Sequence, residues 1–182
     1  GDRCGDRRGG RGRRRRPGGA VVPSRILTGG VLAVLVVAAG AAAAIRLAPD
    51  TPAAWHVDPM TADVGPSDNS WRAAPAEAAG TPDGRGPDYS VPPDELAVAF
   101  DAAVLAQPRV ERIAGDPSEG FMTYRQRSLV FGFPDYVSVR TLPAAGGSTL
   151  AIWSRSRYGR SDFGVNAERV STWLGLLQPL EQ

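Results

Sequence analysis

The residues of this chain best suited to chemistry are arginines that alternate along predicted strands in its second half. Guanidinium groups hold phosphate or carboxylate through paired hydrogen bonds, and aromatic rings can stack beside them. Such a set predicts an anion-binding surface if its members share one face of a sheet. The candidate anion- or partner-binding residues are Arg125, Arg127, Arg140, Trp153, Arg155, Arg157, Arg160 and Asp162.

Three interpretations of these residues stay open at this point. The first is a surface that binds an anionic lipid or a cell-wall ligand. The second is a solvated face, on which the arginines form ion pairs with acids such as Asp135, Asp162, Glu111 and Glu119 and cover Trp153 with their stems. The third is a contact surface for another envelope protein, because arginine and tryptophan are enriched at interface centres.

Catalytic chemistry is not predicted. A nucleophile at Ser154, Ser156 or Ser161 would need a base within hydrogen-bond reach, and the chain has no lysine and a single histidine, His56. His56 precedes a turn-forming Asp-Pro pair, so we interpret it as a linker residue. Cys4 is the only cysteine and lies far from any predicted fold. We therefore expect no catalytic residue, no metal ligand set and no cofactor.

The elements that must position the arginines are four strands and two helices. Strands are predicted at 109–114, 121–131, 136–142 and 149–157, with turn signals between them, and a short strand at 89–91. A helix at 93–107 begins with Pro93, and a last helix follows Asn166, a favourable N-cap. The order β-α-β-β-β-β-α predicts an α+β fold, with an antiparallel four- to five-stranded sheet and two helices on one face.

Hairpin geometry predicts which side chains meet. A tight turn at 146–147 would pair residues whose numbers sum to 293, which sets Arg140 opposite Trp153. A loop at 132–135 would likewise set Arg127 opposite Arg140. Both pairings keep the valines, leucines and isoleucines of these strands on the opposite, buried face. The other face would then carry Arg125, Arg127, Arg140, Arg155 and Arg157, with Trp153, Tyr136 and Phe131 among them.

Charge is unevenly distributed along the chain. Residues 1–25 form an Arg/Gly-rich tail with nine arginines and two aspartates, a charge of +7, within a formal net charge of +2. The remainder therefore carries −5. Such a tail has too few apolar residues to bury a core, and we predict a disordered cytoplasmic segment. Clustered arginines can also bind nucleic acid, but a flank of a membrane segment is the commoner reason for such a run.

An uncharged stretch follows at 26–45, rich in valine, leucine and alanine, and Arg46 ends the predicted anchor at 26–46. At about 1.5 Å per residue, twenty helical residues span the roughly 30 Å of a hydrocarbon core. The heavier positive flank is N-terminal, which predicts a single-pass anchor of the bacterial inner membrane with a cytoplasmic N-terminus and a periplasmic C-terminal domain. The alternative is a cleaved signal peptide, because Ala41–Ala44 offers small residues for cleavage.

Between the anchor and the folded domain, 47–88 reads as a Pro/Ala/Gly-rich linker without a sustained period. Trp55 within it could be an interfacial anchor or could dock back on the domain. The exported α+β domain is accordingly expected at 89–182.

The run SRSRYGRSDFGVNAERV from Ser154, followed by TWL, resembles the signature of a bacterial envelope family known as domain of unknown function 1499. FPDYVSVR from Phe133 and WHVDP from Trp55 are similar to its other common features. The resemblance extends from about Trp55 to the C-terminus. It implies an uncharacterised envelope protein and brings no mechanism, so the arginine face remains the only candidate site.

Overall fold

The computed structural model describes residues 24–49, 51–129 and 132–181. The chain divides into two units, Gly1–Ala39 and Gly40–Gln182. Helix α1 (Ser24–Leu47) provides all the described residues of the first unit and continues into the second. Its stretch Gly29–Leu47 has 19 residues and a mean hydropathy of 2.2, so by length and composition it can cross a membrane. Of the tail expected at 1–25, residues 1–23 lie outside the described part of the chain.

A sheet dominates the second unit, and its four long strands are those that the sequence predicts. Two of them, β6 and β7, form the longest hairpin, and β5 and β4 continue the antiparallel pairing on one side. The sheet order is β2-β1-β7-β6-β5-β4, with β3 also pairing with β7. The strands are β1 (Ser70–Ala74), β2 (Gly84–Arg85), β3 (Asp88–Tyr89), β4 (Val110–Asp116), β5 (Phe121–Arg127), β6 (Pro134–Ala144) and β7 (Gly147–Ser156).

The sheet is larger than predicted, because the segment at 47–88 enters it. β1 pairs antiparallel with β7, and β2 pairs parallel with β1, so the described sheet is mixed and seven-stranded. The expectation of an antiparallel four- to five-stranded sheet is wrong in these details, although the α+β class is confirmed. β1 escaped prediction because its sequence, SWRAA, is short and its burial does not follow polarity, since the charged Arg72 is buried.

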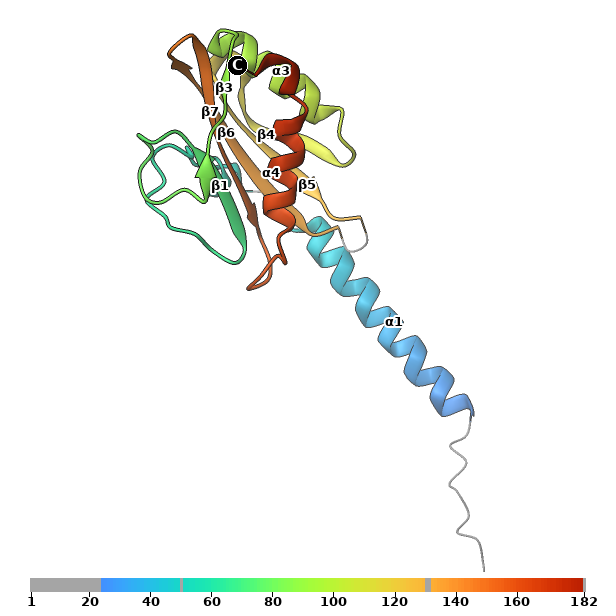
Figure 1. Ribbon diagram of the computed structural model, residues 1–182. Coiled ribbons are helices and arrows are strands. Elements are labelled where there is room, and N and C mark those ends of the chain that lie inside the picture. The colour runs from blue at the N-terminus through green and yellow to red at the C-terminus, as the bar shows by residue number, and fades with distance from the viewer. Residues whose placement is uncertain (1–23, 50, 130–131, 182) are drawn as a thin grey trace, which may run out of the picture. The chain divides into compact units, whose positions relative to one another are not determined.

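Helices α3 (Pro93–Leu105) and α4 (Val165–Gly175) cover one face of this sheet (Figure 1). α3 starts at Pro93, as predicted. Phe100 and Trp173 from the two helices meet Tyr124 of β5, and the Tyr124 and Trp173 rings lie edge to face at 5.9 Å. Truncating one such buried aromatic to alanine costs about 3–5 kcal/mol, so this cluster holds helices and sheet together. Two short 3-10 helices, η1 (Pro117–Glu119) and η2 (Gln178–Leu180), complete the helical layer.

The register of the β6–β7 hairpin differs from the prediction by two residues. Arg140 lies opposite Ala151, and Ser138 lies opposite Trp153, because the turn is formed one residue earlier, by Ala145 and Gly146. Gly146 has a φ of 89°, a conformation that glycine adopts without strain. The shift is an even number, so every side chain keeps its predicted face.

The β5–β6 pairing is displaced further. Arg127 lies opposite Pro134, and Arg125 lies opposite Tyr136, so the predicted Arg127–Arg140 pair is wrong. β5 ends at Arg127 and β6 already begins at Pro134, so the turn at this end differs from the predicted loop at 132–135. This shift is also even, and the arginines remain on one face.

The segment at 47–88 is part of the fold, and its interpretation as a linker is therefore wrong. Its irregular part is organised by one side chain, Arg72 of β1, which is 1% exposed. The Arg72 guanidinium donates hydrogen bonds at 2.5–3.1 Å to four main-chain carbonyls, those of Pro59, Ala62, Val64 and Ala79. The carbonyls of Ala62 and Val64 also accept from main-chain N–H groups, and the buried guanidinium joins all four carbonyls in a segment with little regular secondary structure.

Candidate functional site

The sheet face opposite α3 and α4 is covered by residues 55–59, which we call the strap. The short helix α2 (Pro52–Trp55) leads into it. The Trp55 ring stacks on Tyr136 with centroids 4.0 Å apart, and the His56 ring stacks on Phe121 at 3.8 Å. Of the two roles left open for Trp55, docking on the domain is thus the one observed. The sheet consequently has a cover on both faces.

His56 is docked and is not a linker residue. Its Nδ1 lies 2.9 Å from the Thr123 hydroxyl, within hydrogen-bond distance. Burial lowers the pKa of His56 below its ordinary value, and the charges of Glu119 and Asp58 oppose that shift in part.

Arg155 lies at the centre of the covered face and is 8% exposed. Its Nη2 donates to the Trp55 carbonyl and to the Ser138 hydroxyl, each at 2.7 Å. The guanidinium carbon lies 4.1 Å from the Trp153 ring centroid and 5.5 Å from that of Trp55, so the charge is held between two indoles. Burial lowers the pKa of Arg155 to about 10. Among the described residues no carboxylate forms an ion pair with it.

Arg140 and Arg157 lie on the same face with different partners. Arg140 Nε is 3.8 Å from the Asp58 carboxylate, and its guanidinium lies 5.5 Å from the Phe121 centroid. Arg157 Nη1 donates to the Pro49 carbonyl at 3.1 Å and to the Tyr136 hydroxyl at 3.3 Å. The structure therefore brings most of the predicted arginines together, but it places the strap over their centre.

Arg125 and Arg127 face a pocket at one end of β5, which we call the arginine pocket. Its volume is about 420 Å³, and four arginines line it together with Glu111, the acidic residue among its described lining. Arg109 Nε donates to the Arg127 carbonyl at 2.9 Å, and Arg127 Nη1 donates to the Gly132 carbonyl at 3.1 Å. The described lining is Arg46, Arg109, Val110, Glu111, Arg125, Arg127, Ser128, Leu129 and Gly132.

The electrostatics of the arginine pocket favour an anion. Arg125 pairs with Glu111, yet the pKa of Arg125 is lowered, first by desolvation and then by the charge of Arg127. Both effects disfavour the charged form of Arg125, and Tyr136 opposes them in part, so a further negative charge in the pocket would stabilise the charged form. Sequence reasoning missed Arg46 and Arg109 as members of the pocket. Arg109 could have been found from its position next to Arg125 and Arg127 in the predicted hairpin, whereas Arg46 carried no local signal.

The signature run occupies a different place, between β7 and α4 on the helical side. Ser154 Oγ donates to Asn166 Oδ1 at 2.6 Å, and the Asn166 amide donates to Ser156 Oγ at 3.1 Å. Arg169 Nη1 donates to Ser154 and Asn166, while Arg169 Nη2 pairs with Asp135. All the partners in this network are side chains of the domain itself, so we interpret the signature as a stabilising contact between β7 and α4. Among the described residues, Ser154 has no base beside it.

Asp162 and Arg160 do not join the arginine face. The Asp162 carboxylate accepts from the main-chain N–H groups of Gly164, at 3.0 Å, and Asn166, at 2.6 Å, and so caps α4. The prediction that Asn166 is the N-cap is wrong, because its side chain is buried in the network and α4 begins at Val165. Arg160 is exposed in the loop between β7 and α4.

Within the described part of the chain, no group of three or more His, Cys, Asp or Glu side chains could hold a metal ion. No curated protein and no solved structure matches the chain. A family model does match, over residues 47–177, and these residues include the strap, β1 and the signature network. The chain belongs to the family described as "Protein of unknown function (DUF1499)".

Proposed function

We propose that this is a single-pass membrane protein whose folded domain binds an anionic group in the arginine pocket without catalysing a reaction. The observation that carries the proposal is a space of about 420 Å³ whose described lining includes four arginines and one acidic residue, Glu111. Pockets for small molecules usually have volumes of about 300–1,000 Å³, so the space suits a phosphate or carboxylate with a small organic group attached. An anionic lipid headgroup and a cell-wall fragment both carry this chemistry.

The membrane anchor is the part of α1 from Gly29 to Leu47. The positive charge of the segment before it favours a cytoplasmic N-terminus, with the domain on the other side of the membrane, in the periplasm of a bacterial envelope. A reporter that is active only after export, fused after Gln182, should be active. Mass measurement of the purified chain distinguishes an anchor from a cleaved signal peptide, since a product beginning near Ile45 would refute the anchor.

The covered centre of the arginine face has a structural role in this proposal. Arg155 is enclosed by Trp55 and Trp153, and Arg140 faces Asp58, so neither offers an open fork to a ligand. The arginine pocket, in contrast, is lined by Arg109, which is exposed, and by Arg127, which is half-buried. This division supports anion binding at one end of the face and a solely structural role at its centre.

The test is a titration of the full chain in mild detergent with inorganic phosphate and glycerol phosphate, at low and at physiological salt. Arg109→Gln and Arg127→Gln remove one charge each from the arginine pocket. Loss of a hydrogen bond to a charged group costs roughly 1.5–3 kcal/mol, so affinity should fall about ten- to a hundredfold.

Arg85→Gln is the matched control, because Arg85 pairs with Asp88 on the surface, outside the pocket. This substitution should leave binding unchanged. Equal affinity of the wild type and both pocket variants, or no binding of either probe at low salt, would refute the proposal.

A further inference from the structure

Large apolar side chains are exposed on two loops at one end of the sheet. Phe163, in the loop between β7 and α4, is 95% exposed, and Leu129, in the loop between β5 and β6, is 75% exposed. Phe163 has a φ of 54°, which is uncommon for a residue with a side chain. Tyr158 and Val165 are exposed to 41% and 46%. Water disfavours such a set, so its exposure suggests a partner.

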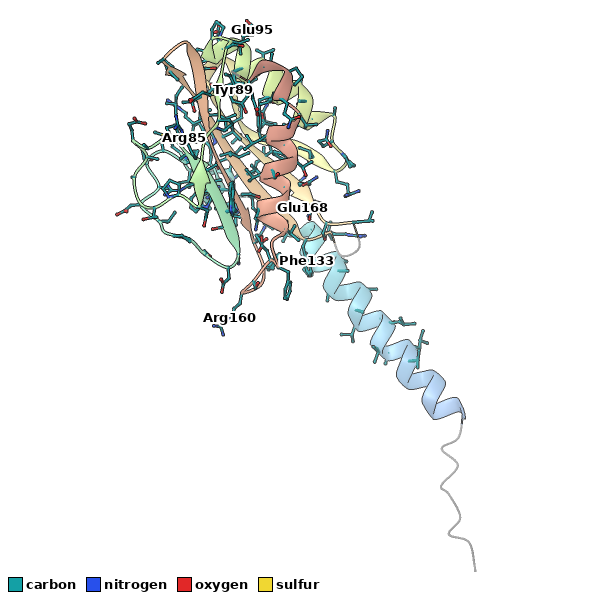
Figure 2. The ribbon with its side chains drawn as sticks, in the orientation of Figure 1. Arg85, Tyr89, Glu95, Phe133, Arg160 and Glu168 are labelled. Atoms are coloured by element: carbon teal, nitrogen blue, oxygen red, sulfur yellow. The ribbon has the colours of Figure 1, made fainter. Side chains whose placement is uncertain are left out.

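The described parts of the two loops lie side by side, and we call residues 128–129, 132–133 and 157–164 together the loop end. The Phe133 and Tyr158 ring centroids are 5.9 Å apart, and the Arg157 N–H donates to the Pro134 carbonyl at 3.3 Å. Figure 2 shows Phe133 and Arg160 at the same end of the domain, with Glu95 of α3 at the opposite end. The two loops that carry the exposed apolar residues are therefore in contact at this end.

Arginines lie near these apolar residues, although Asp162 directly precedes Phe163 and the Asp162 N–H donates to the Asp68 carbonyl at 2.9 Å. Arg157 and Arg160 lie in the same loop as Phe163, and Arg127 lies at the end of β5, before Leu129. Their charge contrasts with the −5 carried by the chain after residue 25. Aromatic residues and arginines are the side chains that occupy a lipid–water interface, where rings lie at headgroup level and guanidinium groups meet phosphates.

The chain itself keeps the loop end close to the end of α1. α1 ends at Leu47, and Arg157 binds the carbonyl of Pro49, two residues later. Two residues span at most about 7 Å. If Leu47 ends a membrane span, Arg157 and its loop lie at the membrane surface and not at a distance from it.

We propose that the loop end docks on the bilayer surface next to the protein's own anchor, with Phe163 and Leu129 entering the interfacial region and arginines binding the phosphates of anionic lipids. The inference rests on the proposed anchor for its location. Phe163 is not among the residues that line the arginine pocket, whereas Leu129 and Arg127 are, so the two proposals share these two residues. The binding partner of the loop end is a bilayer that contains anionic lipid. Exposed rings, excess positive charge and a short connection to the end of α1 all fit such a surface.

The experiment uses the full chain with Cys4→Ser, reconstituted in nanodiscs of zwitterionic lipid with or without anionic lipid. A fluorophore is attached at Ser161→Cys, which leaves Phe163 in place, and quenchers are carried on the lipid chains near the headgroups. Val98→Cys on α3, 60% exposed, is the matched negative control, and Val37→Cys within α1 is the positive control. The label at 161 should be quenched in anionic discs, and the label at 98 should not.

Two variants test the two parts of the surface. Phe163→Ser should remove most of the quenching at 161, whereas Val98→Ser should not change it. Arg160→Gln should shift the docking equilibrium roughly fivefold toward the undocked state in anionic discs, since each basic residue near such a surface contributes about 1 kcal/mol. The shift should vanish in zwitterionic discs.

Quenching at 161 no stronger than at 98 would overturn the inference, and so would an unchanged signal after Phe163→Ser. Glycerol phosphate binding to the chain in mild detergent, where no anionic lipid competes for Arg127, separates this result from the proposed function. Binding without quenching at 161 refutes membrane docking alone, and quenching without binding refutes the arginine pocket alone. If the protein binds a soluble partner at this end, addition of lipid will leave the label at 161 unquenched.

Discussion

Trp55 stacks on Tyr136 with ring centroids 4.0 Å apart and ring planes inclined by 14°. The contact joins a residue shortly after α1 to the first part of β6, 81 positions later by their numbers. It closes the sheet face that the arginines occupy, and it places the Trp55 carbonyl where Arg155 and Ser138 both donate to it. The strap is thus a part of the folded domain, and we expect its removal to lower the stability of the domain.

Trp55→Ala should lower the free energy of unfolding by about 2 kcal/mol. A buried tryptophan truncated to alanine costs about 3–5 kcal/mol, and Trp55 is only partly buried. Trp55→Phe keeps a ring on Tyr136 and should cost less than half as much. Urea unfolding of the full chain in mild detergent measures both. Equal stability of the wild type and Trp55→Ala would mean that the strap is not docked in solution.

Arg169→Met should be among the most destabilising single substitutions in α4. It leaves the Asp135 carboxylate buried without its partner, which typically costs about 3–5 kcal/mol. Arg85→Met breaks an exposed pair with Asp88 and should cost no more than about 1 kcal/mol. Thermal unfolding of the two variants at pH 7 compares them directly. Similar losses would show that the Asp135–Arg169 pair is no more important than a surface pair.

His56 should make the domain less stable as the pH falls below about 6.5. Its pKa is lowered by burial in the folded state, so the unfolded chain takes up a proton more readily than the folded one. The loss develops between the unfolded pKa and the lower folded pKa, and above about pH 6.5 the imidazole is neutral in both states. The groups that face it are Phe121 and Thr123 from β5, with Glu119 and Asp58 as charges.

His56→Gln is the variant that tests this dependence. Acid titration of the carboxylates contributes to both proteins, so the quantity to measure is the difference in unfolding free energy between wild type and variant from pH 7.5 to 5. That difference should shift in favour of the variant as the pH falls. A difference that is independent of pH would show that His56 titrates in the folded state as it does in the unfolded chain.

Gly147→Ala should disrupt the pairing of β3 with β7. A Cβ at Gly147 would lie 2.1 Å from the Tyr89 carbonyl oxygen, a main-chain atom that cannot rotate away. The cost should reach the upper end of the roughly 1–3 kcal/mol that overpacking causes. Gly175→Ala is the control, because nothing lies within 4 Å of its added Cβ and it lies in α4. That variant should gain about 0.5–1 kcal/mol of stability. Losses of the same size in both would contradict this account.

Local patterns in the sequence determined the four long strands, the start of α3, the family and the face on which each arginine lies. Side chains alternate along a strand with a period of two, so the face of Arg125, Arg140 or Arg155 follows from parity alone. The two register errors, of two and six residues, left that assignment intact because both are even. The capped apolar stripe of α4 depends likewise on neighbours within a few residues.

Only the tertiary structure decided what covers that face and what lines the pocket. Arg72 holds the irregular segment 59–80 together by donating to four of its main-chain carbonyls. No periodicity in the sequence predicts such a role. Trp55 reaches Tyr136, and Arg46 joins Arg109 and Arg127, across separations that local propensity cannot encode. Contacts of this kind form only after the chain has closed long loops, so their partners are chosen by packing and by the satisfaction of buried polar groups, and not by the residues adjacent in sequence.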